Sequence, residues 1–67
     1  MRDPNRLESF YEEVKRMHKE HFPDWRYGQL VYNFMSWLAN KKKIDIFFPE
    51  EKELIKLFKE FSGEKVN

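Results

Sequence analysis

The chain has 67 residues, 37% of them charged and 18% aromatic, with a net charge of +1 and no cysteine. A chain of this length forms one domain, and the missing cysteines exclude a disulfide framework and a thiolate metal site, while the near-neutral charge excludes a globally basic nucleic-acid-binding surface. The charged amino terminus is followed by no long apolar run, so we expect no secretory signal, no membrane association and a cytoplasmic location.

A first helix is predicted over residues 4–21. Asp3 and Pro4 are typical of an N-cap followed by proline in the first turn. Apolar and histidine side chains recur at spacings of three and four, which predicts one buried stripe. The stripe comprises Leu7, Phe10, Tyr11, Val14, Met17, His18, His21 and Phe22. On the opposite face we expect Arg16 to form exposed ion pairs with Glu12 and Glu20.

A second helix is predicted over residues 25–40, after a stop at Pro23. Asp24 is expected to cap it, because its carboxylate can accept the free amides of the first turn. Its buried stripe is wide and comprises Tyr27, Leu30, Val31, Phe34, Met35, Trp37 and Leu38. Gly28 is unusual in a first turn, which indicates either a close neighbour or a later helix start.

The last third of the chain predicts an apolar connector over 44–48 and a helix over 49–61 that ends at Gly63. We expect Ile46 and one phenylalanine of the connector to lie under the helices, and residues 1–2 and 64–67 to be frayed. The whole chain is then a single all-α domain of three helices, with the helix over 25–40 in the middle.

Three segments of the sequence resemble a group of short bacterial and prophage proteins. They are Arg2-Asp3-Pro4-Asn5-Arg6, Pro23-Asp24-Trp25-Arg26-Tyr27-Gly28-Gln29-Leu30 and Asp45-Ile46-Phe47-Phe48-Pro49-Glu50-Glu51. Phe48 stands where the group commonly has tyrosine. The resemblance implies a phage or mobile-element origin but no activity, and it marks Arg26, Gly28 and Gln29 as candidate functional residues.

Catalytic and metal-binding patterns are weak in this sequence. His18, His21 and Asp24 have a spacing that metal ligands could use, but no second ligand cluster closes such a site. No serine lies in a recognisable nucleophile setting, and no glycine-rich phosphate loop is present. We therefore expect a protein that is not an enzyme and that holds no metal or cofactor.

The outer side of the second predicted helix is the candidate binding surface. Residues 25–43 contain four basic residues and no acidic one. The candidate partner-binding residues are Trp25, Arg26, Gln29, Tyr32, Asn33, Lys41, Lys42 and Lys43. Tryptophan, tyrosine and arginine are enriched at protein interfaces. This composition predicts an adaptor or inhibitor that binds a protein of the host, with self-association through surplus aromatic residues as a further option.

A nucleic-acid-binding protein is the alternative. Arg26, Gln29 and Asn33 are types that contact base edges, and the three consecutive lysines could meet phosphates. The acidic residues elsewhere in the chain would oppose such binding.

Overall fold

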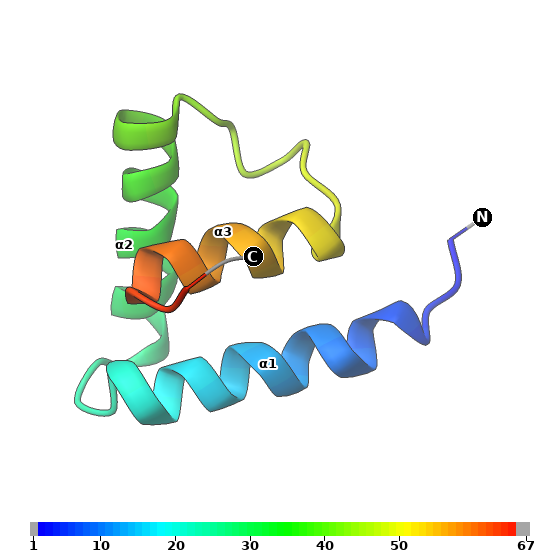
Figure 1. The fold of residues 1–67 in the computed structure, drawn as a ribbon, viewed down its shortest axis with the longest axis horizontal. Coiled ribbons are helices and arrows are strands. Elements are labelled where there is room, and N and C mark those ends of the chain that lie inside the picture. The colour runs from blue at the N-terminus through cyan, green and yellow to red at the C-terminus, as the bar shows by residue number, and fades with distance from the viewer. Residues whose placement is uncertain (1, 66–67) are drawn as a thin grey trace.

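The computed structural model describes residues 2–65, and over this range the chain is all-α with no strand. The elements are α1 (Arg6–His21), α2 (Tyr27–Trp37), the π-helical segment η1 (Leu38–Lys42) and α3 (Glu51–Ser62). Figure 1 shows α1 and α3 side by side and running in the same direction, while α2 crosses them near their carboxyl ends. The predicted three-helix all-α fold is confirmed. However, α3 packs against both other helices, so the helix over 25–40 does not hold the middle position that we expected.

The start of α1 lies two residues later than the sequence predicted. Asp3 Oδ1 accepts a hydrogen bond of 3.0 Å from the Asn5 amide, and the Arg6 amide donates to the Asp3 carbonyl over 3.2 Å. Asp3 therefore closes a turn before the helix, and Asn5 takes the N-cap position. Within the predicted stripe Met17 is fully buried, but Tyr11 is 59% exposed because its ring lies at the margin of the packed face, edge-on to Phe10.

The start of α2 also lies later than predicted, and Asp24 is not its cap. Trp25 stacks on Phe22 with ring centroids 4.4 Å apart, and its amide donates to the Phe22 carbonyl over 3.1 Å. This turn holds the chain out of helical conformation until Arg26, which is the N-cap residue. The Arg26 amide donates to Gln29 Oε1 over 2.8 Å, so the side chain of Gln29 satisfies the cap.

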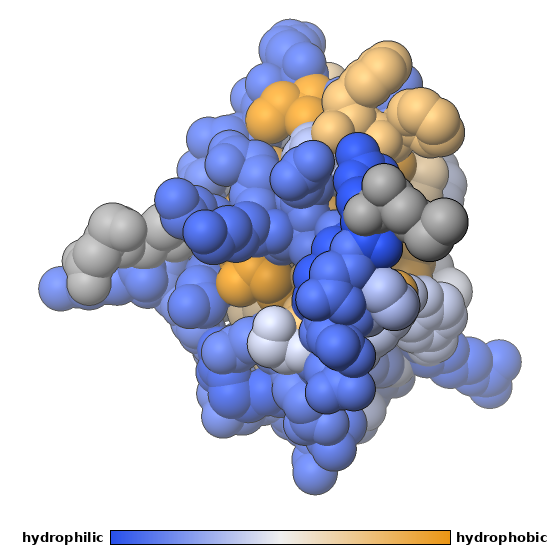
Figure 2. Space-filling model, turned by 90° about the vertical axis from the view of Figure 1, so that its right-hand side faces the viewer, coloured by the Kyte–Doolittle hydropathy of each residue, from blue (hydrophilic) through white to orange (hydrophobic). Residues whose placement is uncertain are grey.

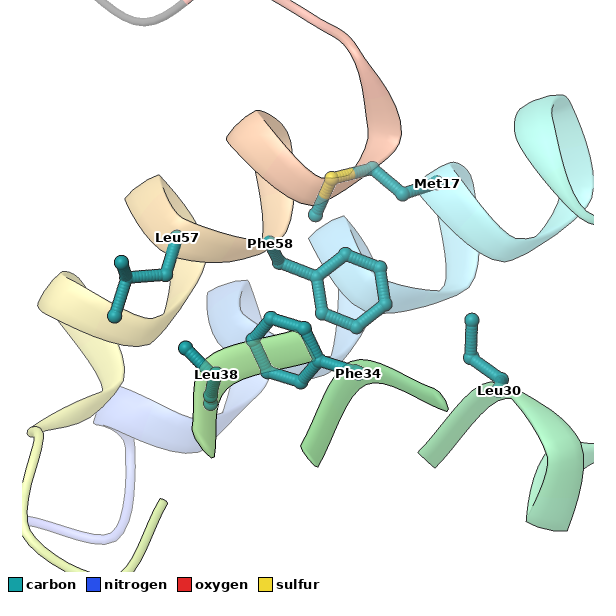
Figure 3. Packing of buried hydrophobic residues seen from close by; sticks show 6 residues of the cluster. All are labelled: Met17, Leu30, Phe34, Leu38, Leu57 and Phe58. Atoms are coloured by element: carbon teal, nitrogen blue, oxygen red, sulfur yellow. The ribbon is translucent and has the colours of Figure 1, made fainter. Parts of the chain in front are cut away.

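The core joins the three helices through six buried side chains. They are Met17, Leu30, Phe34, Leu38, Leu57 and Phe58, shown in Figure 3. The rings of Phe34 and Phe58 meet between α2 and α3, with centroids 4.6 Å apart. Tyr27 and Met35 were expected in this core, but both are exposed, because the face of α2 that packs on the core is narrower than the stripe in the sequence.

The connector after η1 begins with Lys43 in the left-handed conformation, at φ 58° and ψ 39°. Ile44 and Ile46 pack against the core as partly buried side chains. Phe47 and Phe48 remain exposed, so the expectation that one of them is buried is wrong. The Phe47 amide donates to Asp45 Oδ1 and the Phe48 amide to the Asp45 carbonyl, a tight turn that directs both rings outward.

The end of α3 is at Gly63, as the sequence predicted. Gly63 has φ 86°, its amide donates to the Glu60 carbonyl, and the Glu64 amide donates to the Lys59 carbonyl. This pair of hydrogen bonds is a Schellman motif. It brings Glu64 against α1, where it contacts Arg16 and His21, so Glu64 is not the frayed residue that we expected. The rest of that expectation for residues 1, 66 and 67 lies outside the described residues.

Candidate protein-interaction surface

The structure separates the predicted site residues into three groups. Four are exposed: Tyr32 on α2, Lys41 on η1, and Arg26 and Lys43, which flank these two elements. Trp25 is partly buried against Phe22 and Phe61, and Asn33 is partly buried as well. The remaining two have partners within the chain: Gln29 caps α2, and Lys42 Nζ lies 2.8 Å from Glu60 Oε1 and 5.9 Å from the centre of the Trp37 ring.

The solvent side of α2 and η1 presents an unbroken uncharged face. Gly28, Tyr32, Met35 and Ala39 are all exposed and follow one another at spacings of four, three and four, so they share one side of the helix. We call these four residues the uncharged α2 face. Residues 27–40 include no Asp, Glu, Lys, Arg or His. Solvated helix faces carry charged residues, as those of α1 and α3 do, so this composition is typical of a face that another molecule covers.

A shallow groove of about 470 Å³, wide open to solvent, continues this face toward the connector. Its lining, which we call the connector groove, is Met35, Ala39, Lys43, Ile44, Asp45 and Ile46. Met35 and Ala39 belong to both the groove and the uncharged α2 face. The two features therefore form one apolar surface with a depression at its carboxyl-terminal end.

Phe47 and Phe48 follow the groove residue Ile46 in the chain and add further exposed apolar surface. They are 83% and 76% exposed, the highest values among the large hydrophobic side chains of residues 2–65, and their rings meet edge to face at 5.4 Å. Figure 2 shows hydrophobic side chains gathered at the top of the view, over the connector that joins η1 to α3. Exposed aromatic rings of this size are common anchors of protein interfaces.

Sequence reasoning missed Met35, Ala39, Phe47 and Phe48 as candidate binding residues. Met35 was assigned to the core because its spacing fits the apolar stripe of α2. The signal that could have found the surface was the run of 14 residues without charge, 27–40, which is longer than one buried stripe requires.

The two histidines do not form the metal site that the spacing of His18, His21 and Asp24 would allow. His18 Nε2 lies 2.8 Å from the Trp25 carbonyl oxygen, which ties it to the α1–α2 turn. Ligand atoms of His21, Glu20 and Glu64 lie within 4.8 Å of one another. Glu64 already binds the Arg16 guanidinium through both oxygens, at 2.9 and 3.0 Å, and this contact lowers the pKa of Glu64 to about 2. The arginine thus holds the position that a cation would need, and the cluster is a structural ion-pair network.

Fold and surface together define a small all-α domain with an exposed apolar surface on α2, η1 and the connector. None of the helices within residues 2–65 combines the length and the apolar character needed to cross a bilayer. Comparison of the chain with family models, with curated proteins and with solved structures finds no match.

Proposed function

We propose that the chain is a protein-interaction domain, without enzymatic activity, that docks a segment of another protein on the uncharged α2 face and the connector groove. The observation that carries the proposal is the continuity of Tyr32, Met35 and Ala39 with the groove, over a stretch of helix that has no charged residue. The resemblance to prophage proteins makes a host protein the expected partner.

Gly28 supports this use of the face. A Cβ atom built at Gly28 meets nothing within 4 Å, and among residues 2–65 only Lys43 and Gly63 have positive φ. Neither internal packing nor backbone conformation therefore requires glycine here, although it weakens a helix by about 0.5–1 kcal/mol relative to alanine. A position without a side chain on an exposed helix lets the backbone of a partner come close.

A peptide selection tests the proposal. Random peptides of about 15 residues, the length of a helix that spans α2 and η1, are selected on the wild-type protein and measured against Ala39→Glu. We expect the selected peptides to bind the variant at least about tenfold more weakly, because the new carboxylate loses water on docking. Asn40→Glu is the matched control, since it adds the same charge at an exposed neighbour outside the groove lining. Peptides that bind all three proteins equally would refute the proposal.

Nucleic acid is the second candidate partner, because Lys41 and Lys43 are exposed and make no ion pair within residues 2–65. The base-contacting part of that hypothesis is weaker, since Asn33 is partly buried and the Gln29 side-chain oxygen caps α2. Titration with single- and double-stranded DNA and RNA at low and physiological salt tests whether the protein binds nucleic acid. Binding that weakens steeply with salt and is lost in Lys41→Gln/Lys43→Gln would establish this function, whereas a flat response would exclude it.

A further inference from the structure

Building on the proposed function, we infer that the segment docked on the uncharged α2 face has an apolar centre and acidic residues at both of its ends. The inference concerns the chemistry of the partner and rests on where the charges of this chain lie around its apolar surface.

Basic side chains lie at both ends of the surface, with the exposed Asp24 two residues before the amino-terminal one. Arg26 is exposed at the amino-terminal end of α2, and the first turn of the helix has no acidic residue to offset the positive end of the helix dipole. Lys41 and Lys43 are exposed at the other end. None of these three side chains makes an ion pair within residues 2–65, whereas Lys42, which lies between the two lysines, pairs with Glu60.

The one acidic residue in the groove lining does not cancel this pattern. Asp45 Oδ1 accepts a hydrogen bond of 2.9 Å from the Phe47 amide, so its carboxylate serves the turn. Residues 38–46 contain three lysines and this single aspartate. Because Lys42 is paired with Glu60, Lys41 and Lys43 are set against Asp45, and the carboxyl-terminal end of the surface stays basic.

The backbone conformation of Lys43 adds to this argument. It is the non-glycine residue of the described chain with positive φ, at a position where glycine or asparagine would fit with less strain. Lys43 is also one of the residues that line the groove. A charged residue at such a backbone position is consistent with a role for its ammonium group in what the groove binds.

A second copy of the chain is a poor occupant for the same reason. If two α2 faces met in antiparallel fashion, Arg26 of each copy would lie beside Lys41 and Lys43 of the other. If they met in parallel, each basic end would face its own duplicate. Like charges brought together at an interface oppose association, whereas acidic ends on a partner would speed encounter and fix its register.

The length of the surface sets the size of the partner segment. Arg26 and Lys41 are separated by 15 residues of mostly helical chain, so the two basic ends lie roughly 22 Å apart at a rise of about 1.5 Å per residue. An amphipathic helix of about four turns spans that distance with one acidic group near each end.

The peptide selection distinguishes this inference from the proposed function. We expect peptides enriched on the wild-type protein to carry more Asp and Glu than Lys and Arg near their ends. Their affinity should fall about tenfold on Lys41→Glu/Lys43→Glu and should fall further at low than at high salt. Lys19→Glu/Lys56→Glu is the matched control, because it makes the same change in net charge at exposed positions on α1 and α3. This control should bind as the wild type does.

Each outcome separates the two claims. Peptides that need Ala39 but show no acidic bias, or that bind the double lysine variant unchanged, overturn the charge inference and leave the proposed function standing. Peptides that do not distinguish Ala39→Glu overturn both. A dimer in solution that Ala39→Glu dissociates would show that a second copy covers the face, and it would overturn the acidic partner.

Discussion

Glu64 links the carboxyl end of α3 to α1 through its two carboxylate oxygens. Arg16 donates to both of them, and His21 Nε2 lies 2.5 Å from Oε2. The Arg16 guanidinium also contacts Glu13 at 2.8 Å and Glu20 at 3.0 Å, so together with Glu64 it binds three carboxylates. Of these three contacts the sequence predicted the one with Glu20. It did not predict the one with Glu64, which spans 48 residues and depends on the turn at Gly63. The predicted pair with Glu12 is wrong, because Glu12 contacts Lys15.

This network predicts a loss of stability in acid. Hydrogen bonds from Arg16 and then His21 lower the pKa of Glu64 from 4.5 to about 2. A carboxylate with a lowered folded-state pKa stabilises the fold above its unfolded pKa, and this contribution is lost as the pH falls from about 4.5 toward 2. Glu64→Gln should therefore unfold at lower urea than the wild type at pH 7, and the difference should shrink over that range.

Urea unfolding followed by far-UV circular dichroism at stepped pH measures this effect. Glu12→Gln is the control, because its exposed contact with Lys15 at 3.6 Å contributes little to stability. A deficit of Glu64→Gln that stays constant from pH 7 to pH 2 would show that the ionised carboxylate does not act as described.

At the scale of elements, the two glycines have opposite roles. Gly63 ends α3 with φ 86°, a conformation that side-chain-bearing residues adopt at a cost of about 1–2 kcal/mol. Gly28 lies in the first turn of α2 with no such requirement. Gly63→Ala should therefore destabilise the protein by about 1 kcal/mol, and Gly28→Ala should stabilise it by about 0.5–1 kcal/mol.

Thermal and urea unfolding of the two variants provide the measurement, and each is the control for the other. In both positions an added Cβ meets nothing within 4 Å, so the contrast isolates backbone conformation from packing. Equal changes in stability for Gly63→Ala and Gly28→Ala would contradict the opposite roles described for the two glycines. A stabilised Gly28→Ala that binds the selected peptides less well would also show that the bare helix surface serves docking.

The sequence predicted the helices more accurately than their ends. Periodicity located all three helices, because it reports which side of a helix is buried. The ends depend on turns whose side-chain and backbone contacts join residues two or three positions apart, and periodicity does not report these contacts. The stack of Trp25 on Phe22 postpones α2 until Tyr27, and the turn fixed by Asp45 directs Phe47 and Phe48 outward. Local cap residues such as Asp24 carry no information on such contacts.

The sequence predicted the exposure of some candidate surface residues but not of others, because burial also depends on how the helices pack. Arg26, Tyr32, Lys41 and Lys43 are exposed as expected, since charge and helical spacing place them away from the core. Trp25 belongs to the packing between α1 and α3, with its ring centroid 6.4 Å from that of Phe61. From the sequence alone, Trp25 could be an anchor that contacts a partner or a ring that covers the end of the core, and its residue type does not distinguish the two.

At the scale of the whole molecule, an aromatic cluster holds the three helices together. The Phe61 ring lies 5.3 Å from Phe22, 5.5 Å from Phe34 and 5.5 Å from Trp37, measured between centroids. Phe61 thus connects α3 to α2 and to the residue that follows α1. Below about 70–80 residues a single core rarely supplies more than 3–5 kcal/mol of net stability. A ring that joins α3 to α2 and to the end of α1 therefore carries a large share of that total.

Phe61→Ala should remove most of the net stability of the domain. Replacing a core phenylalanine with alanine costs about 3–5 kcal/mol, and Phe61 falls at the lower end because part of its ring stays accessible. Urea titration followed by far-UV circular dichroism should show the variant unfolding at the lowest urea concentrations. Tyr27→Ala removes an aromatic ring that is 68% exposed, and surface changes of that kind are usually within about 0.5 kcal/mol. If Phe61→Ala shifted the midpoint no more than Tyr27→Ala does, the aromatic cluster would not be what holds α2 against α1 and α3, and the surface built on α2 would need another support.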